Sequence, residues 1–211
     1  MSTLSVEIFG ISRTGKTSTL LGLVSHFEKS GESCEVIARP PIDFKSCASL
    51  EDFHDKILSY LETNIPRLKG GKPRYLLMDR GPYDREVMLD ADYMDSQIGR
   101  GFYVEAKERL ARLQTGIDLP LMFLITPETS LARIGTQRDE GLDYSHLCVG
   151  LNTRDTLEGL GQLYAKYVAF QKEKPKINEI HVTGNLDGTI HAVLKRIELK
   201  KIKNGGNLSG Q

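Results

Sequence analysis

The sequence predicts a three-layer α/β fold, in which a parallel sheet of about five strands is covered by helices on both faces. Three observations predict it. Short β-prone segments alternate with helical ones along the chain, a glycine-rich loop joins the first strand to the first helix, and no internal repeat or linker divides the sequence. Because the strands of such a fold run parallel, their carboxyl ends share one edge of the sheet, where ligands are expected.

Each element follows from its local pattern. Residues 4–9 are a β-prone run, and in the helix that follows Leu20, Leu21, Val24 and Phe27 recur at helical spacing. Strands are expected at residues 4–9, 35–38, 75–78, 119–125 and 177–182. Helices are expected at residues 18–29, 50–68, 102–115, 128–137, 153–172 and 186–203. Residues 1–203 are therefore expected to form one domain, and the polar, glycine-rich residues 204–211 a flexible tail.

Charge and cysteine content restrict the class of protein. The 211 residues include 28 basic and 28 acidic side chains, and this balance gives no attraction to nucleic acid or to anionic membranes. The sequence has no apolar segment of signal-peptide type or of transmembrane length. The three cysteines, Cys34, Cys47 and Cys148, show no ligand spacing and fit a reducing compartment. We expect a cytoplasmic protein without membrane or nucleic-acid partners.

The glycine-rich loop has the pattern G-x-x-x-x-G-K-T at residues 10–17. Gly10 and Gly15 allow the backbone to curl so that successive N–H groups point at phosphate oxygens. Lys16 would reach the β- and γ-phosphates, and the Thr17 hydroxyl would bind the magnesium ion between them. The helix that begins here adds its positive end. The pattern predicts a P-loop NTPase fold with ATP and Mg²⁺ as cofactors, held by Gly10, Ser12, Arg13, Thr14, Gly15, Lys16, Thr17 and Ser18.

A second pattern follows the third strand, where an apolar run ends in Asp79-Arg80. Asp79 stands where an acidic residue directed at magnesium belongs, so Thr17 and Asp79 are the predicted metal ligands. Arg80 would emerge at the same edge of the sheet and could hold an anionic oxygen in bidentate fashion. The alternative is an ordinary salt-bridged turn.

Together these motifs resemble the nucleoside and nucleoside-monophosphate kinases, and most closely the thymidylate kinases, over nearly the whole chain. The resemblance implies an ATP-dependent kinase in which Arg13 neutralises the transferred phosphoryl group beside the catalytic Lys16 and Asp79. It implies a lid at about residues 135–150, with Arg138 approaching the phosphates, and a tyrosine-bearing helix at Tyr164 and Tyr167. A homodimer is implied as well. A solvated loop of mixed charge is the alternative to the lid.

Two departures bear on the acceptor. Ser12 stands where thymidylate kinases commonly have an aspartate, and Arg39 stands where related nucleoside kinases have a glutamate that takes the acceptor's proton. A guanidinium cannot act as a base near neutral pH, but it suits an anionic acceptor. We therefore predict a nucleoside monophosphate as the acceptor, with its phosphate held by Arg39 and Arg80.

Two alternatives remain open. Asp43 or Asp84 could replace the missing carboxylate, and the acceptor would then be a hydroxyl, on a deoxynucleoside, another small molecule or a polynucleotide end. The second alternative is a regulatory module that binds nucleotides without transferring phosphate. A GTPase switch is not favoured, because the chain has neither Asn-Lys-x-Asp nor Asp-x-x-Gly after the third strand.

Overall fold

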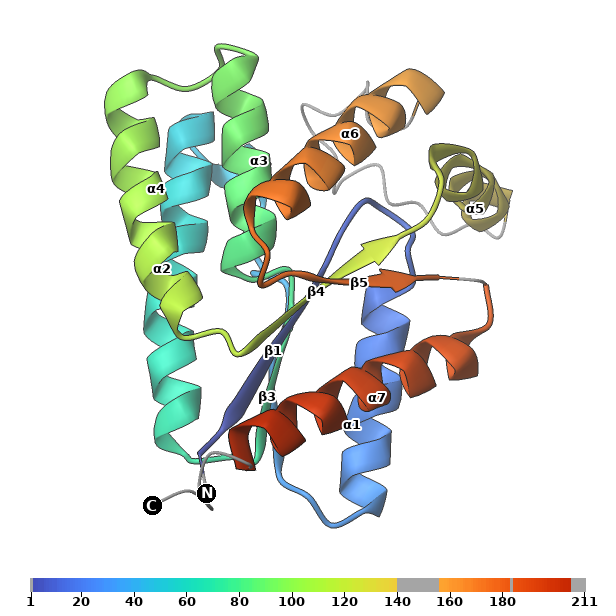
Figure 1. Cartoon of the computed structure of the whole chain (residues 1–211). Coiled ribbons are helices and arrows are strands. Elements are labelled where there is room, and N and C mark those ends of the chain that lie inside the picture. The colour runs from blue at the N-terminus through green and yellow to red at the C-terminus, as the bar shows by residue number, and fades with distance from the viewer. Residues whose placement is uncertain (1, 140–155, 183, 206–211) are drawn as a thin grey trace.

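The computed structural model describes residues 2–139, 156–182 and 184–205. Its strands form one sheet in the order β2-β3-β1-β4-β5 (Figure 1), and all four pairings are parallel. The bounds are β1 (Leu4–Phe9), β2 (Cys34–Ile37), β3 (Tyr75–Asp79), β4 (Leu119–Leu124) and β5 (Asn178–His181). The predicted parallel sheet is confirmed. Because β1 lies between β3 and β4, the three segments that follow these strands meet at one edge.

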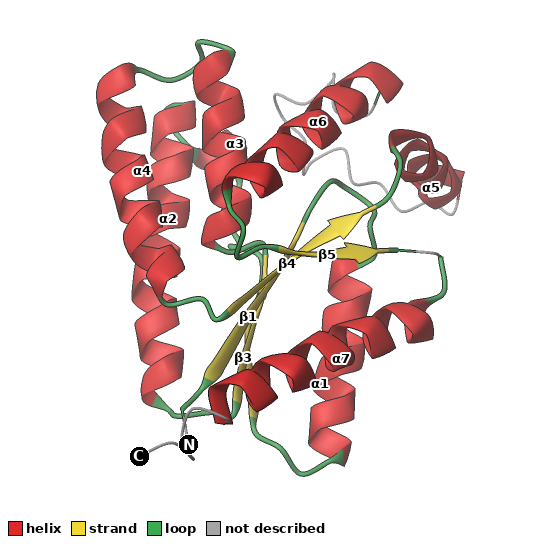
Figure 2. Cartoon of the chain, viewed as in Figure 1, coloured by secondary structure: helices red, strands yellow, loops and turns green. Residues whose placement is uncertain are grey.

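Helices cover both faces of the sheet (Figure 2). They are α1 (Lys16–Lys29), α2 (Leu50–Gly70), α3 (Pro82–Met94), α4 (Arg100–Thr115), α5 (Pro127–Asp139), α6 (Leu157–Glu173) and α7 (Leu186–Gly205), with a short 3₁₀ helix η1 (Phe44–Ser46) before α2. The cores on the two faces show which helices pack where: α1 and α7 cover one face, and α2, α3 and α6 cover the other, with α4 packed on α2 and α3. None of the helices in the described residues is long and apolar enough to span a membrane.

Alternating side chains of β1 supply both cores. Val6 and Ile8 point toward α1 and α7, where they pack with residues such as Leu23. Phe9 points toward the opposite face and contacts the rings of Tyr83 and Tyr167, with centroids 6.0 and 6.2 Å away. Since β1 is buried on both sides, the loop that leaves its carboxyl end starts from a rigid support.

The structure adds one long helix that the sequence pattern missed. Helix α3 starts at Pro82, a residue suited to the first helical turn because its missing N–H would have no partner there. Tyr83, Val87 and Ala91 recur with helical spacing, but the charged residues Asp84, Arg85 and Glu86 are buried as well. Buried and paired charges interrupt the apolar pattern and hide the helix in the sequence.

Two other predictions concern the segment 135–150 and the C-terminus. Residues 135–139 of the predicted lid form the end of α5, and residues 140–150 lie outside the described residues, as do 153–155 of the predicted helix at 153–172. Helix α7 ends at Gly205, two residues into the predicted tail. Residues 206–211 also lie outside the described part.

Candidate functional site

The phosphate loop connects the end of β1 to the start of α1, as the sequence predicts. Gly10 has φ 135° and Gly15 has φ 84°, a region that L side chains rarely adopt. At Gly10 space is also excluded, because an added Cβ would lie 2.4 Å from the Phe123 carbonyl oxygen of β4. Arg13 is left-handed as well, with φ 59°. The loop is therefore a strained turn that its surroundings hold in place.

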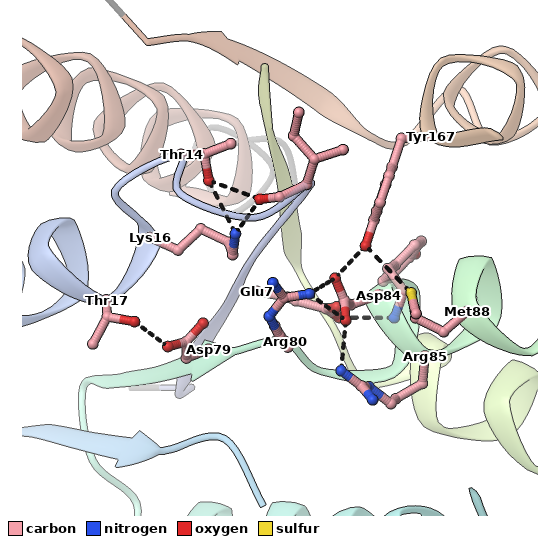
Figure 3. A network of polar contacts seen from close by, with 12 residues as sticks. Glu7, Thr14, Lys16, Thr17, Asp79, Arg80, Asp84, Arg85, Met88 and Tyr167 are labelled. Atoms are coloured by element: carbon pink, nitrogen blue, oxygen red, sulfur yellow. Dashed lines mark hydrogen bonds and ion pairs between the residues drawn. The ribbon is translucent and has the colours of Figure 1, made fainter. Parts of the chain in front are cut away.

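Lys16 reaches back into this loop. Its Nζ atom donates hydrogen bonds to the Ile11 carbonyl oxygen at 2.6 Å and to the Thr14 hydroxyl at 3.0 Å (Figure 3). Burial lowers the pKa of Lys16 well below its usual range, and the Arg80 guanidinium adds to this effect, as Arg39 does to a smaller extent. An anion beside Lys16 would oppose both causes, so the loop, Arg80 and Arg39 form a region suited to bind phosphate.

The two predicted magnesium ligands meet directly. The Thr17 hydroxyl donates to Asp79 Oδ2 at 2.7 Å, and Asp79 is only 9% exposed. The other carboxylate oxygen, Oδ1, is buried without a hydrogen-bond partner. The described residues contain no group of three or more metal-binding side chains, but Mg²⁺ in nucleotide sites uses one or two protein ligands besides phosphates and waters. Thr17 and Asp79 therefore fit a magnesium ion that is shared with a nucleotide.

Beside this pair, Asp84 gathers three donors at the start of α3. Its carboxylate accepts from Arg80 Nη1 at 3.2 and 3.3 Å, from Arg85 Nη2 at 2.7 Å and from the Tyr167 hydroxyl of α6 at 2.7 Å (Figure 3). Asp84 is fully buried. Arg80 has the left-handed φ of 64°, which turns the chain between the end of β3 and α3. We call Arg80, Asp84, Arg85 and Tyr167 the Asp84 cluster.

The charges of the Asp84 cluster determine what it can do. Burial alone would raise the pKa of Asp84, but Arg80 and Arg85, with the Tyr167 hydroxyl, outweigh it and hold this pKa well below its usual range. Burial, together with the neighbouring Asp84 charge, raises the pKa of Tyr167, so its hydroxyl stays protonated. Asp84 is thus an ionised carboxylate with its lone pairs engaged, which orients Arg80 and is a weak proton acceptor.

Glu7 is a buried carboxyl that sequence reasoning missed. It lies in β1, and its Oε2 and Oε1 atoms accept the backbone N–H groups of Tyr83 and Asp84 at 3.0 and 2.9 Å. It therefore caps the N-terminus of α3. Burial raises the pKa of Glu7 to about 8, although both hydrogen bonds act in the opposite direction. An isolated glutamate in a strand expected to be buried on both faces was the signal that could have revealed it.

The remaining predicted residues are placed less centrally. Arg39 is exposed after β2, and its effect on Lys16 places it within electrostatic reach of the loop. Asp43 is exposed and caps η1 by accepting from the Lys45 N–H at 3.0 Å. Ser18 is exposed in the first turn of α1. Arg138 belongs to the last turn of α5, and its side chain lies outside the described part.

Comparison of the sequence with protein-family models and with curated proteins finds no match. Solved structures do match. Two structures of the deoxyadenosine kinase of M. mycoides, one with bound dATP and one with bound dCTP, are each 14% identical to the chain, with a TM-score of 0.61. A third, with the products dCMP and dCDP, is 13% identical with a TM-score of 0.59. All three comparisons cover 92% of this chain and 99% of the other. The chain has the fold of a P-loop kinase.

Proposed function

We propose that this protein is an ATP-dependent phosphotransferase that acts on a nucleoside or nucleotide. The observation that carries the proposal is the 2.7 Å hydrogen bond between Thr17 and Asp79, which brings the phosphate loop and the end of β3 together beside Lys16. The fold supports the same conclusion, because solved structures that share it over 92% of the chain are deoxyadenosine kinases. A phosphate loop alone would fit many ATPases, whereas the adjoining Asp84 cluster supplies a positioned cation for an acceptor or a transferred group.

Each site residue has a defined task in this proposal. The loop N–H groups and Lys16 would bind the β- and γ-phosphates. Thr17 and Asp79 would hold a magnesium ion, which would supply positive charge to neutralise these phosphates. The bond from the γ-phosphorus to its bridging oxygen breaks while a bond to the acceptor oxygen forms. Negative charge passes to this bridging oxygen on the leaving ADP. Arg80, fixed by Asp84, lies beside this region and can stabilise the γ-phosphoryl oxygens or an acceptor phosphate.

The acceptor favoured by the comparisons is the hydroxyl of a deoxynucleoside. The neighbouring structures are named as deoxyadenosine kinases, and one of them holds dCMP as a product. The comparisons therefore support the alternative of a deoxynucleoside acceptor, which the sequence left open, better than they support the thymidylate kinase-like prediction of a monophosphate acceptor. Asp84 is an unfavourable base because its pKa is lowered and three donors engage it. Phosphoryl transfer passes through a loose transition state that makes little demand on a base, however, so the hydroxyl proton would pass to an oxygen of the transferred phosphoryl group, and Asp84 would act only by fixing Arg80.

A nucleoside monophosphate is the second candidate, and a separate observation favours it. Arg39, which follows β2, and Arg80, which follows β3, are both within electrostatic reach of Lys16. Two guanidinium groups can hold an acceptor phosphate, which is already ionised near neutral pH and needs no base.

The decisive experiment measures ADP formation from MgATP with a panel of deoxynucleosides and the corresponding monophosphates, with products identified by mass. Stimulation by a deoxynucleoside identifies a nucleoside kinase, and stimulation by a monophosphate identifies the second candidate. Lys16→Ala should lower kcat by about 100-fold or more. Lys29→Ala, at the exposed end of the same helix, is the control and should leave kcat unchanged. If no acceptor stimulates turnover although ATP binds, the proposal of a kinase is wrong.

Arg39→Ala separates the two acceptors. For a monophosphate it should raise the acceptor KM by about 10-fold, because one charge-assisted contact is lost. For a nucleoside the acceptor KM should change little. Arg67→Ala, which removes an exposed arginine of α2 that bonds Asn64, is the matched control.

A further inference from the structure

Helix α5 contacts the phosphate loop through two hydrogen bonds. The Ser130 hydroxyl donates to the Ser12 carbonyl oxygen at 2.9 Å, and Arg133 Nη1 donates to the Arg13 carbonyl oxygen at 2.8 Å. Ser130 is fully buried. Figure 1 shows α5 leaving the end of β4 next to the loop between β1 and α1. Two successive carbonyl groups of the loop are therefore held by one turn of a neighbouring helix.

These two hydrogen bonds fix the direction of the loop's donors. A trans peptide group is planar, and its C=O and the following N–H point in opposite directions. When the Ser12 carbonyl points at α5, the Arg13 N–H must point away from α5. The Arg13 carbonyl and the Thr14 N–H are related in the same way. Donors that line a phosphate loop are these N–H groups, so contacts on the outer side of the loop determine its inner surface.

The loop needs such support because its backbone is strained. Arg13 adopts a φ of 59°, which costs a non-glycine residue on the order of 1 kcal/mol or more. Rotation of the Ser12–Arg13 peptide would change this φ and turn the Ser12 carbonyl oxygen toward the phosphates. Gly10, at the start of the loop, lies close to the Phe123 carbonyl of β4, the strand that leads into α5. The β4–α5 segment thus supports the loop at three residues, Gly10, Ser12 and Arg13.

We propose that Ser130 and Arg133 are positioning residues, which hold the phosphate loop in its anion-binding conformation and thereby raise its affinity for a nucleotide's phosphate chain. This inference rests on the nucleotide-binding part of the proposed function and is independent of the acceptor. Arg133 acts through the Arg13 carbonyl, and its charge near the loop adds to the attraction for phosphate. Ser130 is neutral and isolates the geometric contribution.

The test is the affinity of the protein for MgATP and for inorganic tripolyphosphate, measured by calorimetry on the full chain. Ser130→Ala should weaken both ligands by about 5-fold, and Arg133→Ala should weaken both by about 10-fold or more. Arg133→Lys should recover part of the loss, because an ammonium group can still donate to the carbonyl. Arg67→Ala is again the control. Unfolding temperatures verify that each variant is folded. If Ser130→Ala does not fold, the affinities of the Arg133 variants alone test the proposal.

Two results would overturn the proposal. One is unchanged affinity for both ligands in folded variants. The other is weaker binding of ATP with unchanged binding of tripolyphosphate, since it would mean that Arg133 contacts the nucleoside and not the loop. Failure of the proposed kinase function is a different outcome from these two results. If the protein binds ATP but transfers its phosphate to no acceptor, the Ser130 and Arg133 variants should still lose affinity for MgATP and tripolyphosphate.

Discussion

Replacing Asp84 with Asn is the most direct test of the Asp84 cluster. The substitution keeps the shape of the side chain, removes its negative charge and places an NH₂ group among donors. Arg80 and Arg85 would then be buried beside a neutral partner. Breaking a buried ion pair by neutralising one partner destabilises a protein by about 3–5 kcal/mol. Each kcal/mol corresponds to about 2–4 °C in a protein of this size, so Tm should fall by about 6–20 °C.

Urea and thermal unfolding at pH 7 measure this change. Tyr167→Phe removes one hydrogen bond to the carboxylate and leaves both arginines, so it should cost less, about 1–2 kcal/mol. Asp95→Asn is the matched control, because this carboxylate at the end of α3 is 57% exposed and lies 3.6 Å from Lys166. It should change stability by less than about 0.5 kcal/mol.

The pH dependence of the stability difference between the wild type and Asp84→Asn provides a second check. Because the folded pKa of Asp84 is lowered, its ionised form contributes stability above the unfolded pKa of about 3.9. That contribution is lost as the pH falls toward the folded pKa, so the difference between the wild type and Asp84→Asn should shrink in acid. A variant within about 1 kcal/mol of the wild type at pH 7 would refute the reasoning that the cluster is an ionised pair.

Three further predictions concern the neighbouring groups. The raised pKa of Glu7, about 8, means that the folded state keeps this proton to higher pH than the unfolded state. The stability that this retained proton contributes is complete below about pH 4.5 and is lost as the pH rises through 8. The free energy of unfolding should therefore fall by about 2 kcal/mol between about pH 6 and 8.5. Glu7→Gln should abolish this dependence on pH. Gly81→Ala would place its Cβ 2.8 Å from Glu7 Oε2 and should cost about 1–3 kcal/mol in urea unfolding, whereas Gly101→Ala, with no atom within 4 Å of its Cβ, should be neutral or stabilising. Asp79→Asn should abolish the gain in ATP affinity that Mg²⁺ provides, and an unchanged gain in calorimetry would exclude Asp79 as a ligand.

The sheet and the phosphate loop could be predicted from sequence because local patterns determine both. Short apolar runs define the strands, and the spacing of Gly10, Gly15 and Lys16 has one mechanical interpretation. The sequence predicts Thr17 and Asp79 as ligands of one magnesium ion, from the phosphate-loop pattern and from the position of Asp79 at the end of an apolar strand. The structure places them 2.7 Å apart, as expected from neighbouring β1 and β3.

Helix α3 and its contacts could not be predicted because they depend on pairs that are distant in sequence. Asp84 pairs with Tyr167, 83 residues further along, and the N-terminus of α3 bonds Glu7 of β1. A sequence pattern shows charged residues as if they were exposed, so it hides a helix whose charges are buried and paired. Gly81-Pro82 was one local signal, because proline often occupies the first turn of a helix. The supporting contacts of Ser130 and Arg133 are hidden for the same reason.

Among the described residues, basic side chains outnumber acidic ones around Lys16 and Asp84. Lys16, Arg80 and Arg85 are buried or nearly so, while Asp79 and Asp84 are the carboxylates that face them. Part of the folding free energy is therefore spent on holding like charges together, and a bound polyphosphate would relieve that repulsion. Binding of an anion at the site should therefore raise the unfolding temperature. A thermal-shift screen of anions would then rank ligands by how well their negative charge compensates the positive charge of the site.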